Sequence, residues 1–520
     1  MAAGTMSSRV LGMVRDILLA ALFSRTVTDA FVVAFRLPNT FRRLLGEGSL
    51  SVAFIPVFVE QLHQDPARAR QLSQAIFALL LTVTSVLTVA GVVFMEPLLQ
   101  LLVGGQEFMS VPGKFEQTVF LARIMFAYLF LVSTYAYFMA IANALGHFLI
   151  PALGPALFNL TFIIFALLPQ SWSRLPGEWL AWGVTVGGLA QAALVAWLLK
   201  SLGFFPRWTW NWQVPGVALV LRNMIPGILG LGVHQLMALV NLNFASRLPE
   251  GSHSYIYWAD RLLELPQSLI AISLGAALLP TLSQLWAEGK REEMLQTSSR
   301  YLRLLLFLAL PSAVGLWLLA LPMVQVLFVR GSFGLEDALA TAQVVQIYAL
   351  LLIVSSVGKV VVPGFYALKN TWLPAVVAAV SLVVHIVLAS YLVASHGLQG
   401  LALSTALAGV VNMSLLLVFY RRMIGALHGA ALLRALGPML GALLLMAVVV
   451  HWGYQTLEAE LLGWVLWENL ARGLALGLVI PLGAVVYIGS CRLMGSPEAL
   501  EVFNLLRQRL KRRRQKTPAA

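Results

Sequence analysis

Long apolar stretches, interrupted only briefly by charged residues, run through most of this sequence and restrict the folds open to it. Hydrophobic residues make up 59% of the 520 residues, charged residues make up only 11%, and the mean hydropathy is +0.84. A soluble domain carries roughly 25% charged residues, and a disordered chain is poor in apolar residues. Both classes are therefore excluded. Because a spanning helix needs about 20 apolar residues, we predict an all-α polytopic membrane protein.

The apolar stretches predict 14 transmembrane helices. Their approximate limits are 5–24, 28–60, 72–103, 116–143, 148–169, 178–200, 215–246, 254–286, 295–329, 338–367, 372–395, 398–420, 434–456 and 469–492. Several of these stretches exceed 30 residues. Helices of that length must tilt, bend or extend into water.

The basic residues indicate how the chain is oriented in the membrane. Cytoplasmic loops of membrane proteins collect Lys and Arg. With the N-terminus in the cytoplasm, the loops on that side hold Arg68, Arg70, Lys200, Arg207, Lys290, Arg291, Lys369, Arg421, Arg422 and Arg434, whereas the opposite loops hold scattered single cations. An even number of spans then places both termini in the cytoplasm. The net charge is +13. We interpret this excess as a consequence of the membrane topology, and the basic tail as a segment that contacts lipid headgroups. We expect no nucleic-acid partner. No cleavable signal peptide is expected.

Short matches at a common spacing indicate an internal repeat. The segment Ser49–Pro56 resembles Ser273–Pro280, 224 residues later, and Pro97–Gln100 resembles Pro322–Gln325, 225 residues later. Two further matches follow in the same order. An even number of spans separates the halves, so they form a parallel repeat about an axis along the membrane normal. We predict a first six-helix lobe (1–205), a second (206–426), a C-terminal helix pair (427–492) and a basic cytoplasmic tail (493–520).

The helices that begin each half carry more charges than a lipid-facing segment tolerates, since charges at membrane depth usually face a cavity or a partner. These residues are Arg9, Arg15, Asp16, Asp29, Arg36, Arg42, Arg43 and Glu47 in the first half, and Arg222, Asp260, Arg261 and Glu264 in the second. A guanidinium group matches phosphate oxygens and stays charged at physiological pH. We predict a wet chamber between the halves that binds an anion such as a phosphate or pyrophosphate.

A purely structural interpretation of these charges stays open. The arginines would then neutralise the neighbouring acids, or extend to lipid headgroups. Arg261 and Glu264 are i, i+3 neighbours and can pair. The two interpretations are evenly balanced for Arg36 and Arg43, and the cavity is favoured for Arg15, Arg42 and Arg261.

Several function classes lack the residues that they require. No phosphate-cradling Gly motif is present, and no His pair at i, i+4 or Asp-rich cluster indicates a metal site. We therefore predict a transporter, not an enzyme, with no cofactor and no bound metal. A membrane-embedded glycosyltransferase would need an acidic cluster facing a wet cleft, and an exporter of cationic drugs would need acids in its cavity. A non-transporting scaffold would need no charged cavity.

Several motifs resemble the MurJ (MviN) family of lipid II flippases, in the multidrug/oligosaccharidyl-lipid/polysaccharide exporter superfamily. They are Ser8–Gly12, Arg15-Asp16, Thr28–Phe31, Phe35–Asn39, Phe41–Arg43 and Gly46–Gly48, followed by Ala259–Leu262 with Glu264 and Pro266, Leu310–Val314 and Pro363–Tyr366. The resemblance covers nearly the whole chain. It implies two six-helix lobes and a C-terminal helix pair that forms a lipid-accessible groove.

The resemblance also implies a substrate and its binding residues. The substrate would be lipid II, the undecaprenyl-pyrophosphate-linked disaccharide-pentapeptide, moved from the cytoplasmic to the periplasmic leaflet of the bacterial inner membrane by alternating access. The implied substrate-binding residues are Arg9, Arg15, Asp16, Arg42 and Arg261, and Asp29, Arg43, Glu47 and Glu264 are expected to line or gate the cavity. Membrane lipids and cell-wall synthases are the expected partners. The alternatives are a flippase for another polyprenyl-pyrophosphate-linked glycan, or a multidrug exporter of the same superfamily.

Overall fold

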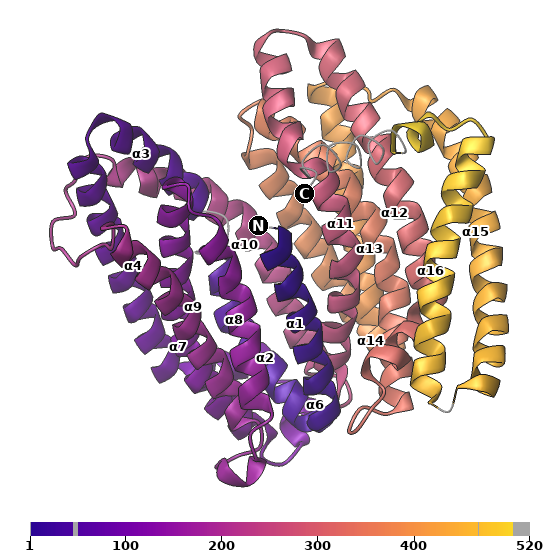
Figure 1. Ribbon diagram of the computed structural model, residues 1–520, viewed down its shortest axis with the longest axis horizontal. Helices are drawn as coiled ribbons and strands as arrows, with labels where there is room; N and C mark the ends of the chain where they lie inside the picture. The colour runs from indigo at the N-terminus through magenta and orange to yellow at the C-terminus, as the bar shows by residue number, and fades with distance from the viewer. Residues whose placement is uncertain (1, 45–49, 466, 503–520) are drawn as a thin grey trace, which may run out of the picture. The chain divides into compact units, whose positions relative to one another are not determined.

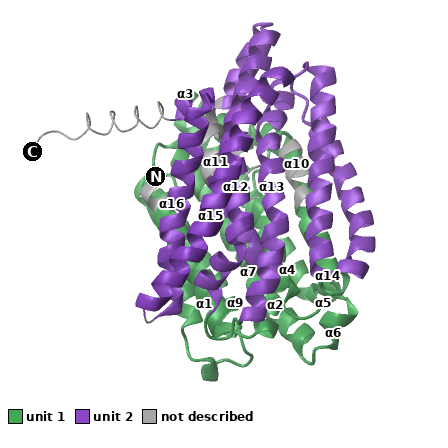
Figure 2. Cartoon of the chain, turned by 90° about the vertical axis from the view of Figure 1, so that its right-hand side faces the viewer, with its two compact units in different colours: residues 1–254, 330–334 green, residues 255–329, 335–520 purple. Residues whose placement is uncertain are grey.

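The computed structural model describes residues 2–44, 50–465 and 467–502, and these are almost entirely helical. Within these ranges the only strand-like pairing is an isolated bridge between Arg330 and Phe333. The predicted all-α class is therefore confirmed. Contacts divide the chain into two compact units, which Figure 2 colours separately: residues 1–254 with 330–334, and residues 255–329 with 335–520.

Unit 1 contains the first ten α-helices in chain order (Figure 1). They are α1 (Ala2–Leu22), α2 (Arg25–Arg42), α3 (Leu50–Gln64), α4 (Pro66–Val93), α5 (Met95–Val103), α6 (Gln106–Ser110), α7 (Lys114–Ala144), α8 (Leu149–Ala166), α9 (Glu178–Ser201) and α10 (Val217–Ala245). A short 3₁₀ turn, Gln170–Trp172, precedes α9.

Capping and aromatic packing fix the long helices of unit 1. The Asp65 side chain accepts a hydrogen bond from the backbone N–H of Ala67, which caps α4 where Pro66 begins the helix. The core between α3, α4 and α7 is aromatic: the Phe54 and Tyr137 ring centroids lie 5.0 Å apart, and Phe77 stacks on Tyr137 at 6.0 Å. These rings fasten α3 to the bundle.

Unit 2 contains longer helices. They are α11 (Ser252–Ala287), α12 (Arg291–Phe328), α13 (Leu335–Ala367), α14 (Trp372–Met423), α15 (Gly429–Trp464) and α16 (Glu468–Leu493), with the first turn of α11 belonging to unit 1 by its contacts. The 52-residue α14 is broken at Gly397, where φ is 54° and ψ is −128°. Glycine adopts this backbone conformation without steric cost. The break separates the predicted spans 372–395 and 398–420.

The last two helices pack on α12 through an apolar core. Phe307 of α12 lies 5.1 Å from the ring of Tyr487 on α16, and Met439 and Met446 of α15 are buried in the same cluster. Two ion pairs extend this packing past α16: Arg303 to Glu498 at 2.9 Å, and Arg300 to Glu501. The beginning of the predicted tail therefore folds against unit 2, whereas its basic residues lie outside the described residues.

Each of the 14 predicted spans overlaps a helix. In the part of the chain that the structure describes, nine helices are long and apolar enough by composition to cross a membrane, and α14 contributes two of the predicted spans. Neither α1 nor α2 is among them, because their charged residues interrupt the apolar sequence. The count of 14 spans therefore stays a prediction, while the multi-pass character is confirmed.

The lobe boundaries predicted from the repeat are not those of the contact-based units. Helix α10, expected to begin the second lobe, packs against α3 and α5 of unit 1, and contacts place the division between Ser254 and Tyr255. A repeat records the duplication of a sequence, whereas contacts record packing in one conformation. The lobes 1–205 and 206–426 therefore stay a prediction.

Candidate functional site

Arg15 of α1 is held in place by two partners. Its Nε and Nη2 donate to the same oxygen of Asp16 at 2.9 and 2.7 Å, and its Nη1 donates to Oδ1 of Asn159 on α8 at 3.1 Å. Asn159 in turn donates to the backbone carbonyl of Ser8 at 2.9 Å. The side chains of Arg15 and Asp16 are only 11% and 4% exposed. The guanidinium is therefore oriented before any ligand arrives.

The other predicted cations of unit 1 lie on α1 and at the end of α2. Arg9 is half-buried on α1, two turns before Asp16. Arg42 ends α2, and its Nε donates to Oδ1 of Asn39 at 2.9 Å. Arg43 is the C-cap residue of α2 and is half-buried. Glu47 lies outside the described residues.

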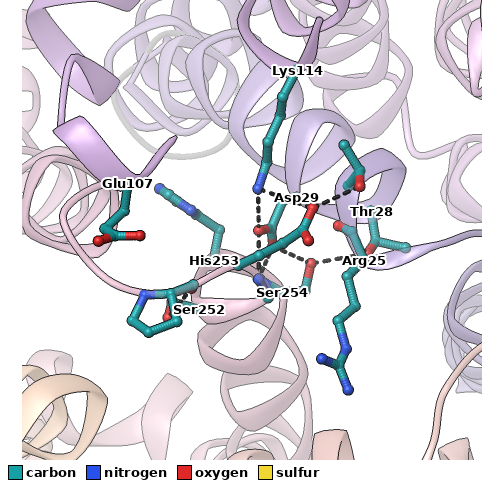
Figure 3. A network of polar contacts seen from close by, with 12 residues as sticks. Arg25, Thr28, Asp29, Glu107, Lys114, Ser252, His253 and Ser254 are labelled. Atoms are coloured by element: carbon teal, nitrogen blue, oxygen red, sulfur yellow. Dashed lines mark hydrogen bonds and ion pairs between the residues drawn. The ribbon is translucent and has the colours of Figure 1, made fainter. Parts of the chain in front are cut away.

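Asp29 is the centre of a fully buried polar network (Figure 3). One carboxylate oxygen accepts from Lys114 Nζ at 2.9 Å and from the backbone N–H of Gly251 at 2.8 Å. The other accepts from the backbone N–H and the hydroxyl of Ser254, at 3.0 and 2.6 Å. Four donors thus saturate one carboxylate and join α2, α7 and the first turn of α11.

A second layer surrounds this carboxylate. Lys114 Nζ also lies 3.7 Å from Glu250, whose carboxylate accepts from the Thr26 hydroxyl at 2.6 Å. The same ammonium lies 4.7 Å from the centroid of the Phe108 ring, which meets His253 edge to face at 5.3 Å. Asp29 was expected to line or gate a cavity. In the structure Asp29 has no exposed surface, and it fastens the residues that precede unit 2 along the chain; its role at a cavity stays a prediction.

Unit 2 presents a more open cluster on α11. Arg261 donates through Nη1 to Glu264 at 2.8 Å and through Nη2 to the Tyr257 hydroxyl at 3.1 Å, and its guanidinium lies 4.8 Å from the Tyr257 ring. The pairing expected from the i, i+3 spacing is present. The side chains of Arg261 and Glu264 are 24% and 48% exposed, so this guanidinium keeps access to solvent.

Several residues at or near these clusters were not predicted from the sequence as site residues, among them Lys114, Ser254 and Lys359. Lys114 looked like a single loop cation, and Ser254 carries no charge, but both bind Asp29 from 85 and 225 residues away. Lys359 of α13 donates to the backbone carbonyl of Gln267 on α11 at 3.1 Å and is half-buried. A charged residue inside an otherwise apolar helix was the one feature of the sequence that could have marked Lys359 as special.

The arrangement is suited to binding an anion. Arginines held by hydrogen bonds lose little freedom when they bind a phosphate, and the guanidinium fork matches its oxygens. Among the described residues, no group of three or more His, Cys, Asp or Glu side chains is placed to hold a metal ion.

Comparisons with known proteins identify the family of this chain. The sequence model of the family described as "Lipid II flippase MurJ" matches residues 18–470. A relative from Bdellovibrio bacteriovorus, described as a probable lipid II flippase MurJ, is 46% identical over 502 residues, covering 95% of this chain and 94% of its own. The chain belongs to the MurJ family. Another MurJ, from Burkholderia cenocepacia and described as a lipid II flippase, is 33% identical over 454 residues, covering 86% of this chain and 88% of its own.

Solved structures agree in fold with this MurJ family member. A MurJ lipid II flippase in an inward closed conformation superimposes with a TM-score of 0.72 at 23% identity, covering 94% of this chain and 98% of its own. An inward-facing multidrug transporter of the MATE family superimposes with a TM-score of 0.68 at 14% identity, covering 82% and 95%. Together with the apolar helices, the family membership makes this chain a multi-pass bacterial membrane protein.

Proposed function

We propose that this protein is a lipid II flippase that moves its substrate from the cytoplasmic to the periplasmic leaflet of the inner membrane. The observation that carries the proposal is the match to the MurJ family over residues 18–470, with 46% identity to a probable lipid II flippase. The reaction is transport, and no covalent step is part of it. Both termini lie in the cytoplasm, in agreement with the distribution of Lys and Arg.

Arg15, Arg42 and Arg261 hold the pyrophosphate of the substrate, with Arg9 and Asp16 beside them in the binding site. Three features support this role. The guanidinium groups lie on helices that begin the two repeats, Arg15 and Arg261 are oriented by neighbouring oxygens, and Arg261 keeps access to solvent. Glu264 holds Arg261 in position until the ligand binds, and Arg43 is part of the same binding function as Arg42 beside it.

A groove in unit 2 has the composition required to hold the polyprenyl chain. It has a volume of about 370 Å³ and lies between α11, α12, α15 and α16. Its lining is almost entirely apolar and includes Pro311, Gly315, Met446, Val450, Ile480 and Tyr487. A hydrocarbon chain gains roughly 25 cal/mol for each Å² of apolar surface that it buries, and this groove is where the resemblance places the lipid tail.

The Asp29 network serves as a latch in the transport cycle. Because it attaches the first turn of α11 to α2 and α7, it stabilises the conformation in which these segments are together. Alternating access requires that such contacts break and re-form. Asp29 therefore has a gating role and does not contact the substrate.

The experiment that tests the proposal measures binding and flipping of lipid II by the purified protein in vesicles. Arg15→Ala and Arg261→Ala should each weaken binding by about 10- to 100-fold, since a hydrogen bond to a charged group contributes about 1.5–3 kcal/mol. Arg174→Ala, in an exposed loop, is the matched control and should bind normally. Unchanged binding in both arginine variants, or equal flipping of a polyprenyl-pyrophosphate lipid with an unrelated glycan, would refute the assignment.

A bulky side chain placed in the apolar groove tests whether the groove holds the polyprenyl chain. A Cβ added at Gly315 would meet no heavy atom within 4 Å, so the backbone position accepts a side chain, and Gly315→Phe adds a bulky ring at a residue that lines the groove. We expect this variant to fold and to flip lipid II at least tenfold more slowly. Gly477→Phe is the control, because Gly477 is equally unobstructed on α16 but does not line the groove. If both variants flip at the wild-type rate, the tail lies elsewhere.

A further inference from the structure

A second groove in unit 2 combines apolar walls with an unusual concentration of amides. It has a volume of about 520 Å³ and lies between α12, α13 and the second half of α14. Its polar lining comes from Gln343, Gln346 and Gln399, and Trp317 forms one side with 54% of its surface exposed. The proposed path of the substrate uses none of these residues.

This groove lies on the face of α13 that points away from α11. Lys359 marks the opposite face, because its ammonium donates to the Gln267 carbonyl of α11. At about 100° per residue, Gln343 and Gln346 lie about 160° and 140° around the helix from Lys359. The groove therefore opens on the face of α13 opposite α11.

The amides of the groove are only partly satisfied. Gln399 donates to the side-chain carbonyl of Gln343 at 2.9 Å, and Gln346 donates to the backbone carbonyl of Trp317 at 3.3 Å. In the described part of the chain, no partner is present for the Gln343 NH₂ group or for the side-chain carbonyls of Gln346 and Gln399. Gln343 and Gln399 are exposed, so these amide groups are available to a ligand that both donates and accepts hydrogen bonds.

Polar and apolar residues occur in a definite order along the groove. Gln399 lies two residues after the break at Gly397, near the start of the second half of α14. Gln343 lies about 12 Å along α13 from the first residue of that helix. Both glutamines are therefore at the same end of the helix bundle. Ile347, Leu350 and Ile353 follow toward the middle of the helix. This order matches a membrane lipid with its headgroup near the surface and an acyl chain below.

We propose that this groove is a specific binding site for a glycerophospholipid whose headgroup donates hydrogen bonds. The phosphate accepts from the Gln343 amide, and the headgroup donor, an ammonium or a hydroxyl, pairs with the free carbonyls of Gln346 and Gln399. An acyl chain lies along Ile347 and Leu350. Placing this lipid in the periplasmic leaflet rests on the proposed topology, whereas the site itself does not rest on the proposed function.

The test compares two lipids that differ only in the headgroup donor. Delipidated protein is titrated with phosphatidylethanolamine or phosphatidylcholine, and bound lipids are counted by native mass spectrometry. We expect one phosphatidylethanolamine to bind about tenfold more tightly than phosphatidylcholine, since the quaternary ammonium of the latter donates no hydrogen bond. Equal affinities of the wild-type protein for the two lipids would overturn the proposal.

Substitutions of the groove glutamines test whether the lipid binds at this groove. The double variant Gln343→Leu/Gln399→Leu removes both partners of one hydrogen bond, which leaves no new orphan group, and should reduce the tenfold preference to about threefold or less, since only the Gln346 carbonyl remains for the headgroup donor. Gln455→Leu, on the exposed surface of α15 and outside the groove, should retain it. The same loss in both variants would contradict the assignment. Undecaprenyl pyrophosphate at equal concentration should not displace the lipid; displacement would assign the groove to the substrate instead.

Discussion

Two ion pairs of this protein, Asp29–Lys114 and Arg261–Glu264, differ in their exposure to water. Asp29 and Lys114 in unit 1 are each 1% exposed, and the carboxylate accepts three further hydrogen bonds from Gly251 and Ser254. Arg261 and Glu264 in unit 2 are 24% and 48% exposed, and the acid lies one helical turn away on the same helix. The first pair joins distant segments, whereas the second only orients one side chain.

This difference predicts different consequences of mutation. Removing one partner of a buried pair leaves an uncompensated charge and costs about 3–5 kcal/mol. An exposed pair contributes about 0–1 kcal/mol, so removing one partner hardly affects folding. The buried pair should therefore be visible in stability, and the exposed pair in ligand binding.

The largest expected effect belongs to Lys114→Met. Without the ammonium, the Asp29 carboxylate stays buried among neutral donors, and we expect a loss of about 3–5 kcal/mol of stability. The fall should appear as a lower thermal unfolding temperature of the purified protein in detergent. In the double variant Lys114→Met/Asp29→Asn no charge is left uncompensated, and most of the loss should be recovered. If the double variant is no more stable than the single one, the pair does not act as a unit.

A smaller but more specific effect is expected for Arg261→Ala. This variant should lose binding of a pyrophosphate-linked lipid by about tenfold or more, because a charged hydrogen bond contributes about 1.5–3 kcal/mol. Its unfolding temperature should stay within a few degrees of the wild type. Arg261→Lys keeps the charge but not the planar fork, and should recover part of the binding. An unfolding temperature as low as that of Lys114→Met would show that Arg261 is structural.

The contrast between the two pairs also shows what the sequence can predict. Arg261 and Glu264 were paired from spacing alone, because residues three apart on a helix are neighbours. Each predicted apolar stretch likewise coincides with helix, and the break between the two halves of α14 was located, whereas the short α6 was missed and α2 with α3, and α4 with α5, were merged into single spans. These features are local, so a single segment contains the information that they require.

The Asp29 network could not be predicted, because its partners come from positions 85 to 225 residues away. Lys114 begins α7 and therefore looked like a residue of the loop before it. Two of the four donors to Asp29 are backbone N–H groups, which leave no signal in the sequence. The sequence singles out Asp29 as a residue that lines or gates a cavity, and that role stays a prediction; what the structure adds is that its carboxylate is fully buried among these donors.

The smallest expected effect is that of Glu264→Gln, which tests whether the exposed pair matters for ligand binding and not for stability. The amide still accepts a hydrogen bond from Arg261, so the free energy of unfolding should change by less than about 1 kcal/mol. Removing the negative charge beside Arg261 also removes its repulsion of a phosphate. Binding of a pyrophosphate-linked lipid should therefore rise by a few-fold at low ionic strength, and this gain should shrink as added salt screens the exposed charges. Titrations at two salt concentrations measure both effects. Weaker binding at both salt concentrations would mean that Glu264 contacts the ligand or fixes Arg261 in its only productive orientation. The exposed pair would then be as necessary for ligand binding as the buried pair is for the stability of unit 1.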